Sequence, residues 1–385
     1  MEQLKSESRN YFLNTFHKEP DLYSQTPGRI NIIGEHTDYT HGYSLPAAIN
    51  RWTICAWKKR DDNLVKIYSS VLDEFWETSL NEIQFSMGQL WKKYVGGSLL
   101  SFQEKIPLQG FELSIHSNIP LEKGLSSSAS IELSIINGLN ELFSGNLTSL
   151  EMSLMAQQVE HQYLELQSGL MDQLACQLSK KDHAVLIDFN SLNTKDIAIH
   201  PNFKDYNWVL VDSLVKRTLA TSKYSERVTQ CSHIIKNISK MGLNSFRDLT
   251  IPLIESLEIP PLLKRRALHI VSENQRTLKT SELLEKGLVK ELGTILLESH
   301  QSLSENYEVS HPNLDFIVQS ALSHEGVLGG RMMGGGFGGC CLFLVSKSSV
   351  KNFSHYISKV YEDFSQMKTE AKSFHFVKGS STFRL

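Results

Sequence analysis

The chain has 385 residues, of which 41% are hydrophobic and 21% are charged, a composition that excludes a disordered or coiled-coil protein. This length exceeds the size at which one hydrophobic core usually stops growing, so two domains are expected. Lysine and arginine number 39 against 42 acidic residues, for a formal net charge of -3. That balance favours neither nucleic acid nor an anionic membrane as a partner.

The amino-terminal residues are polar and charged and lack the apolar core of a secretory signal. The most apolar long window, 326–345, contains Arg331 and is rich in glycine, so it is not expected to span a membrane. Five scattered cysteines without a CxxC pair fit a reduced protein better than a disulfide framework or a zinc site. A cytoplasmic protein is therefore expected.

Short runs of β-branched and aromatic residues alternate with longer amphipathic segments, which is typical of a protein of mixed α and β structure. In chain order, the sequence predicts strands at 52–57 and 111–116, helices at 128–143 and 149–166, strands at 184–187 and 208–211, helices at 222–238, 263–286 and 289–303, and a strand at 341–345. The polar stretch 188–205 is the expected crossing between domains, which we place at 1–190 and 191–385. A last strand-like segment, 373–377, fits either domain.

The first polar motif, PGRINIIGEHTDY at residues 27–39, places Glu35, His36 and Asp38 within four positions beside Gly34. Carboxylates and an imidazole on one turn suit hydrogen bonding to several hydroxyls of a sugar. Metal ligation is a competing hypothesis, although the spacing does not resemble HExxH. A polar turn without a function is the simplest alternative for such a cluster standing alone.

The second motif, LEKGLSSSAS at residues 121–130, precedes an apolar helix. Glycine and serine ahead of a helix leave several backbone N–H groups exposed at the positive end of the helix dipole, which favours a phosphate-binding site. The serine hydroxyls can also bind phosphate or ligate Mg²⁺. A helix capped by serine, with no ligand, is the alternative.

The third motif, GGRMMGGGFGGC at residues 329–340, contains a formal GxGxxG match at Gly334, Gly336 and Gly339. The dinucleotide fingerprint requires a helix after the glycines, whereas the residues that follow read as a strand, so an NAD-dependent oxidoreductase is not expected. The remaining hypotheses are a backbone that approaches a ligand closely and a packed connection between strands. P-loop and protein-kinase motifs do not occur in the sequence.

The three motifs resemble the signatures of the galactokinases, a family of the GHMP small-molecule kinases. Five further segments are similar to galactokinase segments in the same order: LWKKYVGGSLL, VEHQYLELQSGLMDQ, DHAVLIDFNSLNTK, KRTLATSKYSERVTQC and LLESHQSLSENYEVSHPNLD. The resemblance spans residues 12–345. It implies an α+β fold of two domains, in which a ribosomal-S5-like N-terminal domain faces a ferredoxin-like C-terminal domain with the active site between them.

The same resemblance implies a kinase that uses ATP to phosphorylate the C1 hydroxyl of galactose, the first committed step of galactose catabolism. Asp172 would accept the proton of that hydroxyl or position it, and Arg29 would stabilise the transferred charge. The sugar-binding residues would be Glu35, His36, Asp38, Gly169 and Tyr224. The ATP-binding residues would be Gly124, Leu125, Ser126, Ser127, Ser128, Gly334, Gly335 and Gly336, with Ser128 and Glu160 as ligands of Mg²⁺.

Two consequences of these roles can be tested. Asp172→Asn is expected to remove most turnover, and Glu35→Ala or Asp38→Ala is expected mainly to weaken sugar binding. For Asp172 the structural alternative is an N-cap of a helix at 173–179. A monomer is expected, with a dimer left open.

The sequence departs from the family pattern at two places. Glu122 and Lys123 stand where relatives usually carry small residues, including an extra glycine two positions before Gly124, and we expect them to tune the affinity for ATP. Met333 replaces a common threonine. Two other functions remain open: a kinase for N-acetylgalactosamine or a related sugar, and a regulatory sensor of galactose and ATP. The intact GLSSSAS segment and Asp172 argue against the sensor.

Overall fold

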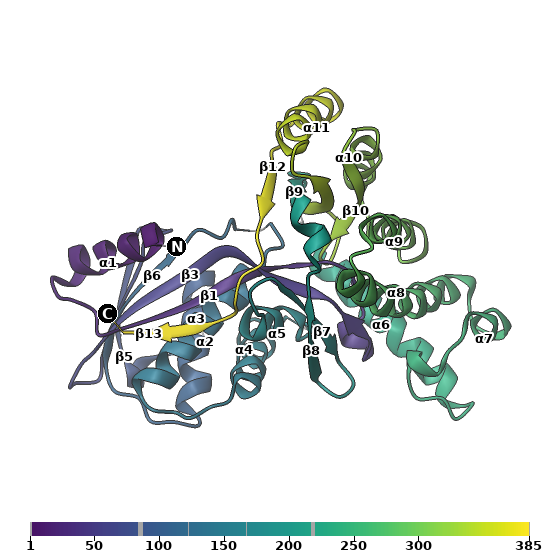
Figure 1. The fold of residues 1–385 in the computed structure, drawn as a ribbon. Coiled ribbons are helices and arrows are strands. Elements are labelled where there is room, and N and C mark those ends of the chain that lie inside the picture. The colour runs from purple at the N-terminus through teal and green to yellow at the C-terminus, as the bar shows by residue number, and fades with distance from the viewer. Residues whose placement is uncertain (1, 84–87, 122, 167, 217–219, 385) are drawn as a thin grey trace.

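The chain forms two lobes, each built around its own sheet. The lobes join near the centre of the molecule, where the long strands of the first sheet reach the second lobe (Figure 1). The computed structural model describes residues 2–83, 88–121, 123–166, 168–216 and 220–384. The helices are α1 (Glu2–Phe16), α2 (Leu90–Gln103), α3 (Ser127–Leu142), α4 (Ser149–Tyr163), α5 (Met171–Leu178), α6 (Ala220–Ser239), α7 (Ile251–Ser256), α8 (Pro261–Lys286), α9 (Val289–Gln301), α10 (Pro312–Leu322) and α11 (Val350–Ser365). The strands are β1 (Leu22–Asn31), β2 (Tyr43–Ser44), β3 (Pro46–Lys59), β4 (Leu64–Ser69), β5 (Glu74–Ser79), β6 (Phe111–Ser117), β7 (His183–Asp188), β8 (Asn193–Ala198), β9 (Tyr206–Asp212), β10 (Val327–Met333), β11 (Cys340–Ser346), β12 (Ala371–Phe374) and β13 (Ser381–Phe383).

The first lobe is a six-stranded sheet in the order β13-β1-β3-β6-β4-β5. Helix α1 lies on one face of this sheet, and α2 to α5 lie on the other (Figure 1). Every residue of β1 is buried because the sheet is covered on both sides, so the strand shows no alternation of polar and apolar residues. Helix α3 approaches the sheet at Gly138, where any side chain would overlap the indole of Trp57.

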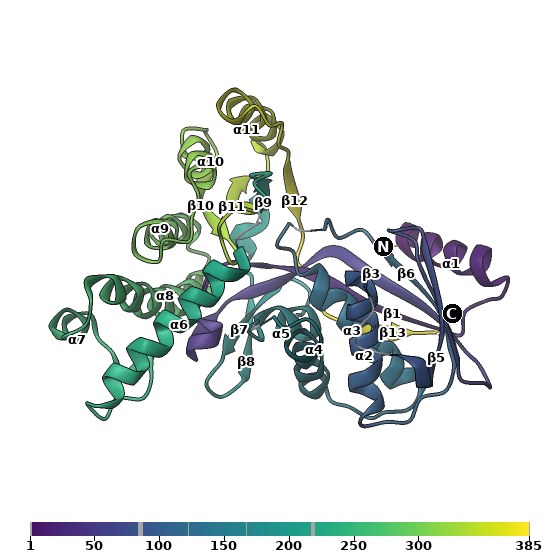
Figure 2. The ribbon, with the colours of Figure 1, turned by 180° about the vertical axis from the view of Figure 1, so that it is seen from behind.

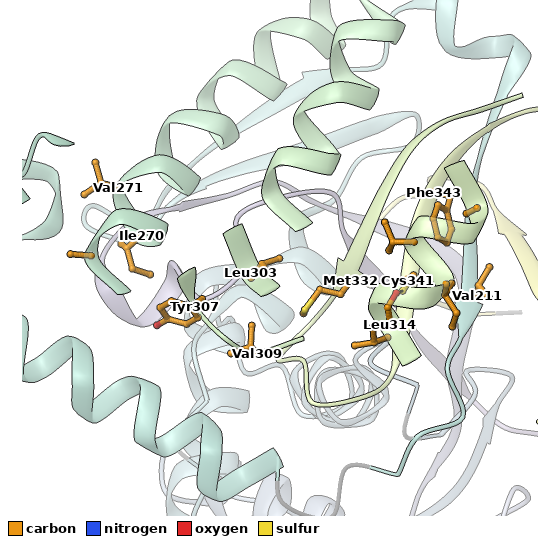
Figure 3. Packing of buried hydrophobic residues seen from close by; sticks show 14 of the residues in the cluster. Val211, Ile270, Val271, Leu303, Tyr307, Val309, Leu314, Met332, Cys341 and Phe343 are labelled. Carbon is orange, nitrogen blue, oxygen red and sulfur yellow. Dashed lines mark hydrogen bonds between the residues drawn. The ribbon is translucent and has the colours of Figure 1, made fainter. Parts of the chain in front are cut away.

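The second lobe contains a four-stranded antiparallel sheet in the order β10-β11-β9-β12. Helices α9, α10 and α11 pack beside it, and α6, α7 and α8 extend away from the first lobe (Figure 2). Its core joins the sheet to the helices: Met332 and Phe343 on the strands belong to the same buried cluster as Leu303, Leu314 and Ile270 (Figure 3). This core has no part in the six-stranded sheet, as expected for a chain too long for a single core.

A buried arginine and a returning strand are among the features that join the lobes. The guanidinium of Arg331, on β10, is completely buried and donates hydrogen bonds to the carbonyl oxygens of Ile32 and Asn31, both at 2.8 Å, at the end of β1. After β12 the chain returns to the first lobe, where β13 pairs with β1. Both chain ends therefore lie beside the six-stranded sheet (Figure 1).

The α+β class is confirmed, and every predicted helix and strand overlaps an observed one. The helix expected at 149–166 ends earlier, at Tyr163. The segment 188–205 contains β8, which forms a hairpin with β7, so the crossing to the second lobe comes only at the end of this segment. The proposed division at residue 190 falls in the turn of this hairpin, and the chain enters the four-stranded sheet only at β9.

The strand-like segment 373–377 lies partly in β12, which pairs with β9 in the four-stranded sheet. Within the described ranges, no helix is both long enough and apolar enough to cross a membrane. Glu122, which the sequence singled out, lies outside the described residues.

Candidate active site

A cavity of about 290 Å³ opens where the two lobes meet, and residues of the first and third motifs contribute to its wall. The predicted site residues that line it are Arg29, Glu35, His36, Asp38, Glu160, Gly169, Asp172, Tyr224, Gly334, Gly335 and Gly336. The predicted residues 124–128 do not line this cavity, but they adjoin it through contacts with Arg29 and Asp172. The structure thus brings together residues from β1, η1 (Asp38–Thr40), α4, α5, α6 and the β10–β11 connection.

The carboxylate of Asp172 is held through both of its oxygens. Arg29 donates from Nε and Nη2 to Oδ1, at 3.0 and 2.6 Å, and the hydroxyl of Ser126 donates to Oδ2 at 2.6 Å. The N-cap hypothesis for Asp172 is wrong, because α5 starts at Met171 and Leu170 occupies the cap position. Asp172 lies within the first helical turn, so its side chain is available to the cavity.

Arg29 is almost completely buried at the end of β1. Burial alone would lower the pKa of Arg29, but the nearby Asp172 and Glu35 carboxylates outweigh it and raise the pKa. The guanidinium is therefore a permanent positive charge beside the Asp172 carboxylate. Its Nη1 also donates to the carbonyl oxygen of Gly124 at 2.5 Å, so one side chain contacts both the cavity and the second motif.

The second motif forms a loop that leads directly into α3. Ser126 has a left-handed backbone with φ of 58° and makes no side-chain cap on the helix, so the simple capping hypothesis is wrong for this residue. Its hydroxyl contacts Asp172 instead. Ser127 and Ser128 begin α3, and N–H groups in the first turn of a helix have no partner within the helix. This loop retains the properties of an anion site.

The first motif supplies buried polar groups to the cavity. The Nδ1 atom of His36 lies 2.8 Å from the hydroxyl of Tyr39, while its buried Nε2 atom has no hydrogen-bond partner. Burial lowers the pKa of His36 to about 4, so the ring is neutral near pH 7. The ring of Tyr224 packs 5.4 Å from that of His36, and burial raises the pKa of Tyr224 well above its usual value.

Asp38 carries an unusual carboxyl group. Burial, with a smaller contribution from Asp172, raises the pKa of Asp38 to about 7. Gly169 packs directly against it, and any side chain at that position would overlap the Asp38 carboxylate. Gly169 therefore leaves the space in which Asp38 reaches the cavity.

Glu160 and Ser128 fit the pair of oxygen ligands expected for a divalent cation. Burial, and then the neighbouring Asp172, raise the pKa of Glu160, and hydrogen bonds from Ser168 and Ser128 oppose this shift. Gln173 Nε2 donates to Glu160 Oε2 at 3.1 Å. In the described part of the chain, no cluster of three or more His, Cys, Asp or Glu side chains forms a metal site. Two protein ligands suit Mg²⁺ when substrate phosphates and water supply the others.

The third motif was expected either to approach a ligand closely or to form a packed connection between strands, and different glycines of the motif do each. It connects β10 to β11 in an antiparallel pair, so no helix follows the glycines and the dinucleotide hypothesis is excluded by structure as well. Side chains at Gly329 or Gly330 would overlap the backbone of Gly293 or the ring of Phe343, so these two positions serve packing. Gly334, Gly335 and Gly336 instead line the cavity.

Sequence reasoning missed three groups near the site. Arg331 donates from Nη2 to Glu35 Oε1 at 3.1 Å, and the N–H of Gly334 donates to the same oxygen at 2.7 Å. Ser168 donates its hydroxyl to Glu160. Glu132, on the inner face of α3, is completely buried. A lone arginine within a glycine-rich apolar run was the sequence signal for Arg331.

Glu132 leads to a prediction about stability. Neither carboxyl oxygen makes a well-formed hydrogen bond, and the same is true of Oε1 of Gln173, whose side chain has only a weak opposing effect on the pKa of Glu132. Burial, and then the charge of Glu160, raise the pKa of Glu132 well above its usual value. A carboxyl group with a raised pKa stabilises the fold below its unfolded pKa, and this contribution is lost as the pH rises toward the folded pKa.

Glu132→Gln is therefore expected to raise the free energy of unfolding at pH 8 by about 1–3 kcal/mol, because the amide carries no charge and can donate to Gln173. The gain should be smaller at pH 5. Urea denaturation at the two pH values checks this, and equal or lower stability of the variant at pH 8 would show that Glu132 is not a neutral buried acid.

Three family descriptions match the chain. Residues 10–59 match the galactokinase galactose-binding signature, residues 93–180 match the GHMP kinase N-terminal domain and residues 280–363 match the GHMP kinase C-terminal domain. These ranges include the first motif, the second motif and the third motif respectively. The order is the one expected from the resemblance in the sequence.

Similar proteins agree with this assignment. The galactokinase of Roseiflexus sp. (strain RS-1) is 35% identical over 93% of this chain and 92% of its own length, and that of Levilactobacillus brevis is 36% identical over 90% and 92%. The crystal structure of Lactococcus lactis galactokinase complexed with galactose superimposes with a TM-score of 0.92 at 33% identity, covering 98% of this chain and 99% of that one. A mevalonate kinase structure, at 17% identity and a TM-score of 0.65, shares the fold. The chain belongs to the galactokinase family of the GHMP kinases, and it is an ATP-dependent sugar kinase.

Proposed function

We propose that this protein transfers the γ-phosphate of ATP to the C1 hydroxyl of galactose, yielding galactose 1-phosphate and ADP. The observation that carries the proposal is that one cavity is lined both by the Arg29–Asp172 pair and by the cluster of Glu35, His36 and Asp38. The complex of the Lactococcus lactis relative with galactose supports galactose as the sugar. The names of the curated relatives support the same activity.

The first motif would recognise the sugar. The unpartnered Nε2 atom of neutral His36 can hydrogen-bond one sugar hydroxyl, and the carboxylate of Asp38 can accept from another. Tyr224 and Gly169 complete the wall of the same cavity. Several fixed polar groups in a buried site discriminate strongly between sugars, because a missing or misplaced hydroxyl leaves a protein group unpaired.

Asp172 would orient the C1 hydroxyl and accept its proton during transfer. Its contacts with Arg29 and Ser126 fix the carboxylate in place, which is how a general base gains most of its effect. Arg29 also contacts the loop of the second motif. The guanidinium can therefore stabilise negative charge that spreads over the transferred phosphoryl group.

The loop of residues 124–128 would bind the triphosphate at the amino terminus of α3, and Gly334, Gly335 and Gly336 would approach the substrates from the second lobe. Glu160 and Ser128 would hold Mg²⁺, since both offer oxygen atoms next to the cavity. When bound, Mg²⁺ would offset the negative charge of the phosphates. Ser168 and Gln173 keep the Glu160 carboxylate oriented by donating to it.

Measurement of ADP release from Mg-ATP tests the activity, with galactose, glucose, N-acetylgalactosamine, arabinose and no sugar compared in parallel. Galactose should give the highest turnover, at roughly 1–100 per second. A clear preference for another sugar would change the assigned substrate but not the class of reaction. A folded protein that binds galactose without turnover would be a sensor and would overturn the proposal.

The ionisation of Asp38 predicts a pH dependence of sugar binding. Because burial raises the pKa of Asp38 to about 7, the carboxylate is largely protonated at pH 6 and largely ionised at pH 8. An ionised carboxylate accepts hydrogen bonds more strongly than a neutral acid, so the Kd for galactose should fall over this range, by up to about tenfold. Titration calorimetry with galactose checks this.

Asp38→Asn is the matched control, because its amide cannot ionise. This variant should bind galactose more weakly at pH 8, with little change in Kd between pH 6 and pH 8. A wild-type Kd that stays constant over the same range would contradict the role of Asp38.

A further inference from the structure

Lys123 is a feature of this chain that the proposed reaction does not use. It stands immediately before Gly124 in the proposed phosphate-binding loop, at one of the places where the sequence departs from the family pattern. In the structure its ammonium group forms an ion pair with Asp212 Oδ2. Asp212 is the last residue of β9, in the four-stranded sheet of the second lobe. The ion pair therefore links the loop of the first lobe to the sheet of the second.

The contact at Lys123 includes its backbone as well. The thiol of Cys340 donates to the carbonyl oxygen of Lys123 at 3.2 Å, and Cys340 is the residue opposite Asp212 in the pairing of β11 with β9. Asp212 is itself firmly held: its Oδ1 accepts the N–H of Leu214 at 2.9 Å, and its carbonyl accepts the hydroxyl of Thr369 at 2.6 Å. The anchor for Lys123 is thus a fixed point on the sheet.

The next two residues of the loop are attached to the first lobe. Arg29 binds the carbonyl of Gly124 through its side chain, and its backbone N–H donates to the carbonyl of Leu125 at 3.2 Å. Residue 123 is therefore held by one lobe and residues 124–125 by the other. A loop fixed at both points offers its N–H groups to phosphate with less loss of conformational freedom on binding.

We propose that Lys123 and Asp212 are positioning residues that hold the phosphate-binding loop against the second lobe and so increase the affinity for ATP. The inference rests on the proposed function, because it takes the loop of residues 124–128 to bind the triphosphate. It supplies a physical basis for the tuning of ATP affinity expected at Lys123. The ion pair acts on nucleotide binding and does not touch the sugar site, because neither Lys123 nor Asp212 lines the cavity that holds the sugar-binding residues.

The expected effect is modest because the pair is partly open to water. The side chains of Lys123 and Asp212 are 36% and 19% exposed, and both line a cavity of about 310 Å³ outside the active site. Ion pairs of this kind contribute little free energy and are screened by salt. Removal of either charge should therefore raise the KM for ATP about two- to fivefold.

The test compares Lys123→Met, Asp212→Asn and the double variant in the full-length enzyme, with galactose saturating. Each single variant should raise the KM for ATP, and the Kd for Mg-ATP measured by calorimetry, by similar factors. The double variant should be no worse than the weaker-binding single variant, because both substitutions remove one interaction. The kcat and the KM for galactose should stay unchanged, and Lys123→Arg should restore the wild-type KM for ATP.

Lys372→Met is the matched control. Lys372 lines the same cavity and pairs with Glu370 at 3.3 Å, so its loss removes an equal charge without touching the loop, and the KM for ATP should not change. The proposal is overturned if neither single variant changes the KM for ATP, if Asp212→Asn is silent while Lys123→Met is not, or if Lys372→Met has the same effect. Absence of turnover in the wild type would refute the proposed function instead. In that case the Kd values of the variants for Mg-ATP would still show whether the ion pair increases the affinity for ATP.

Discussion

Asp172→Asn is expected to lower kcat by about 10²–10⁴-fold, since this is the usual contribution of a positioned general base. The asparagine keeps an oxygen that can accept from Arg29, as Asp172 Oδ1 does at 3.0 and 2.6 Å. The fold and the Kd for galactose should therefore remain close to those of the wild type. Single-turnover measurement of galactose 1-phosphate, with galactose affinity measured separately by calorimetry, distinguishes loss of chemistry from loss of binding.

Two comparisons make this result specific. Asp172→Glu keeps the charge but shifts the carboxylate by one methylene group. It should retain more activity than the asparagine variant only if the cavity accommodates that shift. Ser126→Ala removes the donor to Asp172 Oδ2 and should reduce kcat less than Asp172→Asn. Turnover of Asp172→Asn within about tenfold of the wild type would show that Asp172 is not the base.

Glu35→Ala is expected to lower the free energy of unfolding by about 3–5 kcal/mol, in addition to any effect on sugar binding. The sequence predicted mainly weaker sugar binding for this change. In the structure, however, Glu35 is almost completely buried and its Oε1 accepts from both Arg331 and the N–H of Gly334. Removing the carboxylate leaves the fully buried charge of Arg331 without an ionic partner at the junction of the lobes. Urea denaturation followed by far-ultraviolet circular dichroism measures the loss.

The double variant Glu35→Ala with Arg331→Met tests the cause of the loss. If the stranded charge is responsible, the double variant should be more stable than Glu35→Ala alone, because replacing both partners of a buried pair costs less than removing one. Glu35→Gln keeps an oxygen acceptor and should fall between the wild type and the alanine variant. A stability of Glu35→Ala equal to that of the wild type would mean that Arg331 is sufficiently held by its contacts with Asn31, Ile32 and Met332.

The sequence by itself determined the types of most elements and the identity of the three motifs. Apolar periodicity was sufficient for helices such as α3 and α8, and runs of β-branched and aromatic residues for strands such as β6 and β11. The sequence also excluded the dinucleotide hypothesis. That hypothesis requires a helix after the glycines, whereas the local pattern of residues 340–346 predicts a strand. The resemblance of the motifs placed the chain in its family, and the comparisons confirmed this.

Only the tertiary structure decided which of these residues meet. Asp172 lies 143 positions from Arg29, and Arg331 lies 296 positions from Glu35. Such contacts depend on the order of strands in the sheets and on how the lobes pack, and neither leaves a periodic signal in the sequence. Tertiary packing likewise decides which glycines of the third motif serve packing and which line the cavity. It also decides that Lys123, which the sequence shows only as a departure from the family pattern, pairs with Asp212. Neighbouring residues determine the local chemistry of a motif. Charge pairing across a domain junction depends on distant segments, which only the folded chain brings within hydrogen-bond distance.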